Sequence, residues 1–280
     1  MFYITALTIA GSDCSGGAGI QADIKTMSAL GVYAASAITS VTVQNTFGVQ
    51  AIQTVSPEIV KGQIQAVLRD IRPDVIKIGM VNDSETIRAI VDAIGGYHCK
   101  GVVIDPLMLA TSGDALMRRD ALNTFCKILL PLATILTPNI PEAETLSGIK
   151  IGSAVDVRAA AQRIMRLGCH NILIKGGHAD GDAKCDYYFE YSSDKHSEYI
   201  FAENKVDTVN THGTGCTLSS AIASYLAQGL KLADAVARAK TFITKALLAG
   251  SDVKIGDGKG PVNHFFAPQP LIKKSEQFLL

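Results

Sequence analysis

Residues 4–44 read ITALTIAGSDCSGGAGIQADIKTMSALGVYAASAITSVTVQ, and they predict a strand, a helix and a second strand in succession. Residues 4–11 form a short apolar run that ends in glycine, which is typical of a buried strand. Residues 19–30 carry apolar side chains at helical spacing, and Gly31 ends the predicted helix. Residues 35–44 are rich in Val, Ile and Thr, which favours a strand. A strand–helix–strand unit of this kind begins a parallel sheet.

The same alternation continues along the rest of the chain. Further strands are predicted at residues 49–55, 75–80, 102–106, 134–137 and 171–175, a hairpin at 187–191 and 198–202, and helices at 57–70, 84–94, 118–129, 141–146, 154–167, 215–228 and 232–248. Short apolar strands between helices predict an α/β fold in which a mostly parallel sheet is covered on both faces. No linker rich in Pro, Gly or Ser interrupts the pattern, so we expect one domain over residues 1–266 and a loose C-terminal tail over 267–280.

The composition argues against several classes of protein. The 280 residues contain 26 Lys and Arg against 26 Asp and Glu, and no basic run is long enough for a nucleic-acid footprint. The six cysteines are scattered without a C-x-x-C pair, so neither a disulfide framework nor a zinc site is expected. Free thiols and an apolar start without a basic leader indicate a cytoplasmic protein. No apolar run reaches the length of a membrane span.

Polar and glycine residues follow the predicted strands at the end where each strand stops. In open parallel sheets, ligands bind beyond the carboxyl ends of the strands. The residues at those positions are Gly11, Ser12, Asp13, Gln44, Gly79, Met80, Asp105, Asn139, Lys175 and Gly176. We therefore expect the ligand site along this edge.

Residues 207–216, DTVNTHGTGC, directly precede a long predicted helix. Glycines allow several backbone N–H groups to converge, and a helix start adds positive partial charge, so the segment is suited to a phosphoryl group. The alternative is an ordinary glycine-rich turn. No G-x-x-x-x-G-K-[ST] motif is present. Residues 17–22 match the dinucleotide fingerprint in letters, but no acid lies between Asp23 and Glu58 to bind a ribose, which disfavours a dehydrogenase.

Six segments in order carry a resemblance to a known family. They are residues 10–23 (AGSDCSGGAGIQAD), 76–80 (IKIGM), 105–106 (DP), 138–143 (PNIPEA), 211–216 (THGTGC) and 256–265 (GDGKGPVNHF). Together they resemble the hydroxymethylpyrimidine/phosphomethylpyrimidine kinases of thiamine biosynthesis, within the ribokinase-like superfamily. The resemblance implies a ribokinase-like three-layer αβα sandwich with a mostly parallel central sheet, usually dimeric. It also implies two successive transfers from ATP with Mg²⁺, which make the pyrimidine monophosphate and then its diphosphate.

Four residues are expected to hold the substrate ring. A carboxamide donates and accepts side by side, so Gln44 complements the edge of an aminopyrimidine, and the family's substrate-binding glutamine falls at this position. The resemblance also implies that Asp23 contacts the ring and that Gly11 and Met80 line the same pocket. From the residues alone, Gln44 also fits a surface strand end, Asp23 a helix start and Met80 the apolar core.

Metal and phosphate chemistry is expected beside the substrate. Asn139 and Glu142, at a helix start, are suited to ordering water around Mg²⁺, although the same pattern is typical of a helix cap. Asp105 follows a buried strand where phosphates and metal would lie, with a simple Asp-Pro turn as the alternative. Lys175 would neutralise charge on the triphosphate, or would extend from a strand end into solvent. The Thr208 hydroxyl is expected to contact phosphate oxygens.

The glycine loop is expected to supply the catalytic groups. Gly213, Thr214 and Gly215 would surround the transferring phosphoryl group. Cys216 stands where many ribokinase-like enzymes carry an aspartate base. The pKa of a thiol at a helix start can be lowered, although nearby phosphate charge opposes that shift. The hypothesis is that Cys216 accepts the proton of the alcohol and also shapes the loop. Residues 109–114 are expected to form a flap over the site.

Two other functions remain open from the sequence. A pyridoxal kinase performs the same chemistry on another ring hydroxymethyl group, and only Gln44 argues against it. A non-catalytic binding module would keep the pocket without turnover, but intact Asn139, Glu142 and Lys175 disfavour it. The expected partners are a small pyrimidine, ATP and a second copy of the chain, with no nucleic acid and no membrane.

Overall fold

A computed structural model describes residues 1–108, 117–178, 183–191 and 196–275. Within this part of the chain, nine strands form one sheet in the order β10-β9-β8-β7-β6-β5-β2-β3-β4. Their bounds are β2 Thr5–Asp13, β3 Tyr33–Asn45, β4 Gly48–Thr54, β5 Val75–Ile78, β6 Val102–Ile104, β7 Ile135–Leu136, β8 Asn171–His178, β9 Ala183–Tyr191 and β10 His196–Asn204. The strands from β8 to β3 are parallel, whereas β4, β9 and β10 are antiparallel to their neighbours. The mostly parallel sheet is confirmed.

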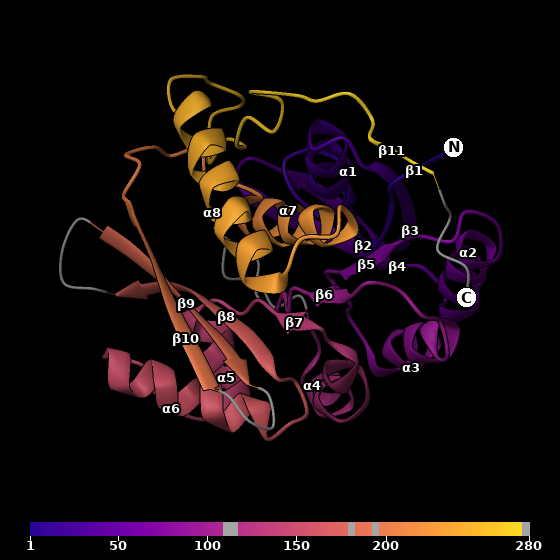
Figure 1. Cartoon of the computed structure of the whole chain (residues 1–280), viewed down its shortest axis with the longest axis horizontal. Coiled ribbons are helices and arrows are strands. Elements are labelled where there is room, and N and C mark those ends of the chain that lie inside the picture. Colours follow the sequence, from indigo (N-terminus) through magenta and orange to yellow (C-terminus); the bar gives the residue numbers. More distant parts are fainter. Residues whose placement is uncertain (109–116, 179–182, 192–195, 276–280) are drawn as a thin grey trace.

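Helices cover both faces of this sheet (Figure 1). One face carries α1 Gly19–Ala29, α7 Thr214–Ala227 and α8 Leu232–Ala249; the other carries α2 Pro57–Asp70, α3 Ser84–Ile94, α4 Arg119–Thr124, α5 Ile140–Ser147 and α6 Ala154–Met165. A π-helical turn, Phe125–Leu129, continues α4, and a 3₁₀ turn, Leu130–Leu132, follows it. The arrangement is the three-layer αβα sandwich expected from the resemblance.

The short strand β5 shows how one strand serves both layers. Successive side chains of a strand point to opposite faces of the sheet. Ile76 and Ile78 enter the core on the side of α2 to α6, whereas Val75 enters the core on the side of α1, α7 and α8. Lys77 is fully buried, and the alternation directs it to the face of Val75. A charged side chain therefore lies inside the layer beneath α7.

The C-terminal tail lies against the start of the chain. The short strand β11, Lys273–Lys274, pairs with β1, Phe2–Tyr3, in a separate two-stranded sheet. The N–H group of Ile4 donates to the carbonyl oxygen of Ile272 at 3.1 Å. The loose tail expected from the sequence is therefore not found in residues 267–275. The partners of the tail are at the other end of the sequence, so local composition carried no sign of the pairing.

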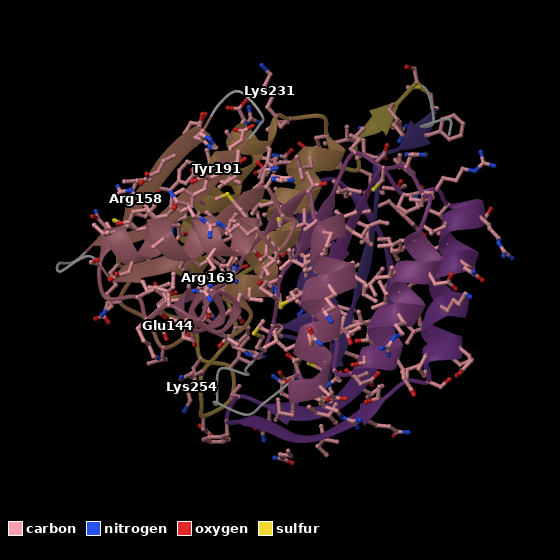
Figure 2. All side chains as sticks on the ribbon, turned by 90° about the horizontal axis from the view of Figure 1, so that it is seen from below. Glu144, Arg158, Arg163, Tyr191, Lys231 and Lys254 are labelled. Atoms are coloured by element: carbon pink, nitrogen blue, oxygen red, sulfur yellow. The ribbon has the colours of Figure 1, made fainter. Side chains whose placement is uncertain are left out.

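Charged side chains lie over the outer surface, as Arg158, Lys231 and Lys254 in Figure 2 illustrate. Arg158 of α6 is among them, and its Nε lies 2.8 Å from Oε2 of Glu198 in β10. This ion pair links α6 to the antiparallel end of the sheet. Among the helices of the described residues, none is long and apolar enough to cross a membrane.

Candidate active site

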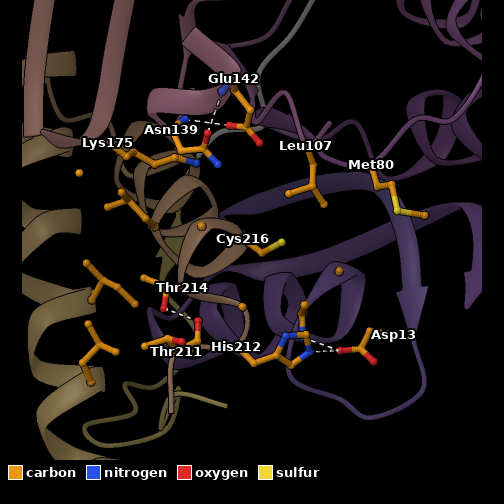
Figure 3. A pocket seen from close by; sticks show the side chains of 18 of the residues that line it. Asp13, Met80, Leu107, Asn139, Glu142, Lys175, Thr211, His212, Thr214 and Cys216 are labelled. Atoms are coloured by element: carbon orange, nitrogen blue, oxygen red, sulfur yellow. Dashed lines mark hydrogen bonds and ion pairs between the residues drawn. The ribbon is translucent and has the colours of Figure 1, made fainter. Parts of the chain in front are cut away.

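A pocket of about 590 Å³ opens at the carboxyl ends of β2, β3 and β8, beside the start of α7. Ten of the thirteen residues expected at the site line it, namely Gly11, Gln44, Met80, Asn139, Glu142, Lys175, Gly213, Thr214, Gly215 and Cys216. Figure 3 shows Asn139, Glu142 and Lys175 on one side, His212 and Asp13 on the opposite side, and Cys216 between them. The predicted edge of the sheet is therefore where the pocket forms.

The glycine loop before α7 forms one wall of the pocket. Gly213 is the N-cap of α7 and has a φ of 79°, which favours glycine. A Cβ atom at this position would lie 1.8 Å from the carbonyl oxygen of Gly17. The Thr214 hydroxyl donates to the carbonyl oxygen of Thr211 at 2.7 Å and closes the turn (Figure 3). The pocket thus meets the positive end of the α7 dipole, which is suited to an anion.

Lys175 and Asp105 form an ion pair beside this loop. The Lys175 Nζ lies 2.7 Å from Oδ1 of Asp105, and a Cβ atom on Gly215 would lie 3.4 Å from that Nζ. Burial alone would raise the pKa of Asp105, but the charges of Lys175 and Lys77 outweigh burial and lower it. Asp105 therefore stays ionised and holds the ammonium group next to the loop.

Asn139 and Glu142 form a reciprocal cap at the start of α5. The Glu142 N–H donates to Oδ1 of Asn139 at 2.9 Å, and the Asn139 N–H donates to Oε2 of Glu142 at 2.8 Å (Figure 3). The other oxygen, Oε1 of Glu142, is buried and has no hydrogen-bond partner in the described part of the chain. Burial raises the pKa of Glu142 to about 7; nearby Lys175 opposes the rise and Asp105 adds to it. The cap uses only Oε2 of Glu142, so the pair can cap α5 and still offer Oε1 to a metal ion or its water.

The pocket also presents an amide and a thioether. Gln44 lines it at the end of β3, and Met80 lines it after β5. A Cβ atom on Gly11 would lie 2.8 Å from Cε of Met80, so the glycine leaves room for the thioether. Together they form a polar edge beside an apolar surface, which fits a flat heteroaromatic ring.

His212 and Asp13 are site residues that the sequence analysis did not assign. The His212 Nε2 lies 2.8 Å from Oδ2 of Asp13 (Figure 3). The same Nε2 lies 3.4 Å from Nε2 of the Gln44 carboxamide. His212 and Asp13 both belong to segments that carried the resemblance, and Asp13 also stands at a strand end. The signal that was missing is their contact, because 199 positions separate them in the sequence.

The expected contact between Asp23 and the substrate ring is wrong, because Asp23 does not line the pocket. Its side chain is fully buried and lies 2.8 Å from Nζ of Lys77. Thr8 and Ser220 donate their hydroxyls to the same carboxylate, at 2.5 and 2.6 Å. The carboxylate is saturated by partners inside the core, so it has no oxygen left for a substrate ring. The contact with Lys77 joins residues 54 positions apart, so the sequence alone did not reveal it.

Two other expected residues also stand apart from the pocket lining. Asp105 lies behind Lys175, with 1% of its side chain exposed. The Thr208 hydroxyl accepts the N–H of Asn210 at 3.1 Å and closes a local turn before the glycine loop. Neither side chain is among the residues that line the cavity. The expected flap at residues 109–114 lies outside the described residues.

Cys216 corrects the expectation about its thiol. Burial raises the pKa of the Cys216 thiol to about 11, although the charge of Lys77 opposes the rise. Asp23 and Asp105 add to the rise. The start of α7 therefore does not produce a thiolate in the resting protein, because burial and two carboxylates outweigh the lysine. Cys216 faces the pocket as a neutral thiol.

Comparison with known proteins agrees with this geometry. The sequence profile described as phosphomethylpyrimidine kinase matches residues 13–263. The chain belongs to this family. The hydroxymethylpyrimidine/phosphomethylpyrimidine kinase of Rhizobium meliloti (strain 1021) is 49% identical over 261 residues, which are 93% of this chain and 96% of that protein.

Solved structures of two kinases resemble this member of the phosphomethylpyrimidine kinase family. The crystal structure of phosphomethylpyrimidine kinase from Clostridium difficile 630 has a TM-score of 0.75 at 45% identity, covering 87% of this chain and 99% of that one. The pyridoxal kinase from Staphylococcus aureus in complex with AMP-PCP and pyridoxal has a TM-score of 0.84 at 34% identity, covering 95% and 94%. The chain is therefore a phosphotransferase of the ribokinase-like fold, as its sequence motifs implied.

Proposed function

We propose that the protein transfers phosphate from ATP to the hydroxymethyl group of 4-amino-5-hydroxymethyl-2-methylpyrimidine, and then adds a second phosphate to make the diphosphate for thiamine biosynthesis. One observation carries this proposal: an anion-binding helix start and the carboxamide of Gln44 face a single pocket. Family membership and the name of the Rhizobium meliloti relative support the choice of substrate.

The protein's own groups divide the work between the two ligands. Gln44 and Met80 hold the ring, and the loop from Gly213 to Cys216 receives the migrating phosphoryl group. Lys175 supplies positive charge beside that loop. Phosphoryl transfer has a loose transition state, so positioning and charge stabilisation contribute more than a strong base does.

The residues on the Glu142 side fit a hydrated Mg²⁺ ion. Oε1 of Glu142 is a buried acceptor without a hydrogen-bond partner in the described chain, and its neighbour Asn139 adds an amide to the same side of the pocket. Within the described residues, no cluster of three or more His, Cys, Asp or Glu forms a closed metal cage. Mg²⁺ usually keeps several waters and binds one or two carboxylates plus substrate phosphates. Glu142, with Asn139 acting through water, would hold the ion, which neutralises phosphate charge when bound.

The role of Cys216 as the base that accepts the alcohol proton has to be revised. A neutral thiol in a buried site does not take up a proton from an alcohol before transfer begins. Cys216 keeps the role of shaping the pocket next to Gly215. The alcohol passes its proton to an oxygen of the transferred phosphoryl group as the new P–O bond forms and the bond between that group and ADP breaks. The loose transition state makes this late proton loss feasible.

A pyridoxal kinase activity is the second candidate. The Staphylococcus aureus neighbour, whose structure contains AMP-PCP and pyridoxal, matches this chain along nearly its whole length. Its identity of 34% is lower than the 49% of the Rhizobium meliloti relative. The carboxamide of Gln44 favours an aminopyrimidine, because the carboxamide has a hydrogen-bond donor and an acceptor in adjacent positions.

A second copy of the chain is a further proposed partner, and the cytoplasm is the proposed location. Val41, Val43 and Phe47 expose large apolar side chains on β3 and the β3–β4 turn, next to the edge strand β4. Burying them between two copies would remove apolar surface from water. Sedimentation as a monomer would contradict the dimer. The six free cysteines favour a reducing compartment.

A steady-state assay with two alcohols tests the function. The protein, Mg²⁺ and ATP are incubated with the hydroxymethylpyrimidine or with pyridoxal, and kcat/KM is measured for each. We expect the pyrimidine to be preferred by at least about tenfold, the size of one well-formed pair of hydrogen bonds. A preference for pyridoxal would move the assignment to the second candidate, and no turnover of either alcohol would reject both.

A further inference from the structure

The carboxamide of Gln44 is held at both ends by residues that face the pocket. Its Oε1 lies 3.1 Å from Oγ1 of Thr42, and its Nε2 lies 3.4 Å from Nε2 of His212. The backbone of Gln44 is anchored as well, since the Cys14 thiol donates to its carbonyl oxygen at 3.1 Å. The oxygen and nitrogen ends of a carboxamide have nearly the same shape, so their neighbours decide which end faces which way.

The neighbour on one side is a histidine whose Nε2 carries a proton. Asp13 is a carboxylate, because hydrogen bonds from His212, Ser15 and Ala18 outweigh its burial and lower its pKa to about 2. A carboxylate only accepts hydrogen bonds. The His212 Nε2 at 2.8 Å must therefore be the donor, whether the ring is neutral or charged. A protonated Nε2 is unable to accept a hydrogen bond from an amide nitrogen.

The ring of His212 is also fixed in place. A Cβ atom on Gly17 would lie 2.3 Å from Cδ2 of His212 and 3.1 Å from Cβ of Pro261, so the ring packs closely against Gly17, with Pro261 nearby. The backbone N–H of His212 donates to the carbonyl oxygen of Gly260 at 3.0 Å. The closing segment of the chain thus anchors the backbone of His212, whose ring lies against Gly17 and contacts Asp13.

The neighbour on the other side is a hydroxyl whose proton is already engaged. The Thr42 Oγ1 donates to the carbonyl oxygen of Ser12 at 2.9 Å. A backbone carbonyl only accepts, and a hydroxyl has one proton to give. The Thr42 oxygen is therefore left as an acceptor toward Gln44. The group that faces it must be a donor, which is the NH₂ end of the carboxamide.

We infer that Asp13, acting through His212, and Ser12, acting through Thr42, orient the Gln44 carboxamide with its oxygen toward His212 and its nitrogen toward Thr42. This exchanges the two ends of the amide relative to the distances given above, in which Oε1 faces Thr42 and Nε2 faces His212. Each of the two contacts favours this orientation, and the two together hold it. The free edge of the amide then presents an acceptor on the His212 side and an N–H donor on the Thr42 side. Asp13, His212 and Thr42 are positioning residues, since each acts on the ligand through Gln44.

The orientation selects one arrangement of hydrogen-bonding groups on the ring, and this step rests on the proposed function. A 4-aminopyrimidine places its amino group toward the His212 side and its ring nitrogen toward the Thr42 side. The 4-oxo counterpart has the reverse order, a carbonyl acceptor followed by a ring N–H donor. Turning the oxo ring over would restore the match to Gln44, but it would carry the neighbouring hydroxymethyl group away from the glycine loop.

Binding of two matched rings without ATP tests the inference. Dissociation constants are measured by calorimetry for 4-amino-5-hydroxymethyl-2-methylpyrimidine and for its 4-oxo counterpart. We expect the unmodified protein to prefer the amino ring by at least about tenfold. Thr42→Val, which keeps the shape but removes the hydroxyl, is expected to reduce that preference at least about fivefold, and Thr42→Ser is expected to restore it. An unchanged preference in Thr42→Val would overturn the inference.

The tautomer of His212 provides a readout that does not depend on any ligand. In protein labelled with ¹⁵N-histidine, long-range ¹H–¹⁵N correlation reports which ring nitrogen carries the proton, and His212→Gln identifies the signal. We expect a protonated Nε2 in the unmodified protein and loss of that fixed state in Asp13→Asn, whose carboxamide both donates and accepts. An unprotonated Nε2 would overturn the inference. If neither ring binds, the proposed function fails, while the tautomer still decides the orientation of Gln44.

Discussion

The ammonium group of Lys77 lies 2.9 and 2.8 Å from the two carboxylate oxygens of Asp23, and both side chains are fully buried. Thr8 and Ser220 complete the cluster with hydroxyl donors to the same carboxylate. The four residues come from β5, α1, β2 and α7. This ion pair therefore connects the central sheet to the helix whose first turn forms the phosphate loop.

Removing one partner of this ion pair should destabilise the protein strongly. We expect Lys77→Met or Asp23→Asn alone to lower the free energy of unfolding by about 3–5 kcal/mol, because each leaves a buried group without its partner. The double variant should lose less than the sum of the two, since neither charge remains uncompensated. Urea unfolding of the four proteins measures this coupling. Additive effects would show that the two side chains do not interact.

The pH dependence of cation binding should follow Glu142. A pKa of about 7 means that the carboxyl is mostly protonated at pH 6 and mostly ionised at pH 8. Between those values the ionised fraction rises about tenfold, so the apparent affinity for Mg²⁺ should rise by about the same factor. Titration of ATP turnover with Mg²⁺ at both pH values measures the change.

Glu142→Gln provides the matched control for that titration. Glutamine keeps the cap of α5, since it accepts from the Asn139 N–H as glutamate does, but it does not titrate. The variant should bind Mg²⁺ more weakly and with no change between the two pH values. A tenfold pH effect that persists in the variant would show that a group other than Glu142 titrates.

Stability should fall as the pH is lowered through the range in which His264 would become protonated. Burial lowers the pKa of His264 to about 4, with Lys25 and His212 adding to the effect. An unfolded histidine has a pKa near 6.5, so below that pH the unfolded state binds more protons than the folded state. From pH 8 to pH 5 this one group should remove about 2 kcal/mol from the free energy of unfolding.

His264→Gln isolates that contribution. The substitution itself changes the free energy of unfolding at pH 8, so the decisive quantity is how much that free energy falls from pH 8 to pH 5. We expect the fall to be smaller in the variant than in the unmodified protein by about 2 kcal/mol. Parallel slopes would mean that His264 is protonated equally well in the folded and unfolded states.

Cys216→Ala should leave the protein an active kinase. A neutral thiol contributes shape and not base catalysis, so kcat should fall by less than about 100-fold, the lower end of what a general base contributes. The pH–rate profile should keep its form. A larger loss, together with disappearance of a thiol titration from the profile, would restore the base role for Cys216.

The order of elements and the edge that carries the site were predictable from the sequence, because both depend on local patterns. Apolar runs alternating with helical spacing predict parallel strands, and parallel strands bring their carboxyl ends together. These local patterns predicted Gln44, Asn139 and Lys175 at one edge of the sheet, and all three line the pocket. The prediction did not require the order of the strands in the sheet.

The features that the sequence did not reveal are contacts between distant segments. Lys77 sits in an apolar strand and gave no sign of pairing with Asp23, 54 positions earlier. His212 and Asp13 meet only because the loop before α7 lies against the loop after β2. The pKa of the Cys216 thiol depends on its burial and on charged side chains from distant parts of the chain. A local sequence motif does not carry that information.

The central claim is that the loop from Gly213 to Cys216 receives a phosphoryl group opposite a ring held by Gln44. A time course followed by mass spectrometry, with the hydroxymethylpyrimidine and Mg-ATP as the only substrates, tests it most directly. The account predicts a monophosphate that appears first and a diphosphate that accumulates as the monophosphate declines. Release of inorganic phosphate from ATP with no phosphorylated pyrimidine at any time would contradict it.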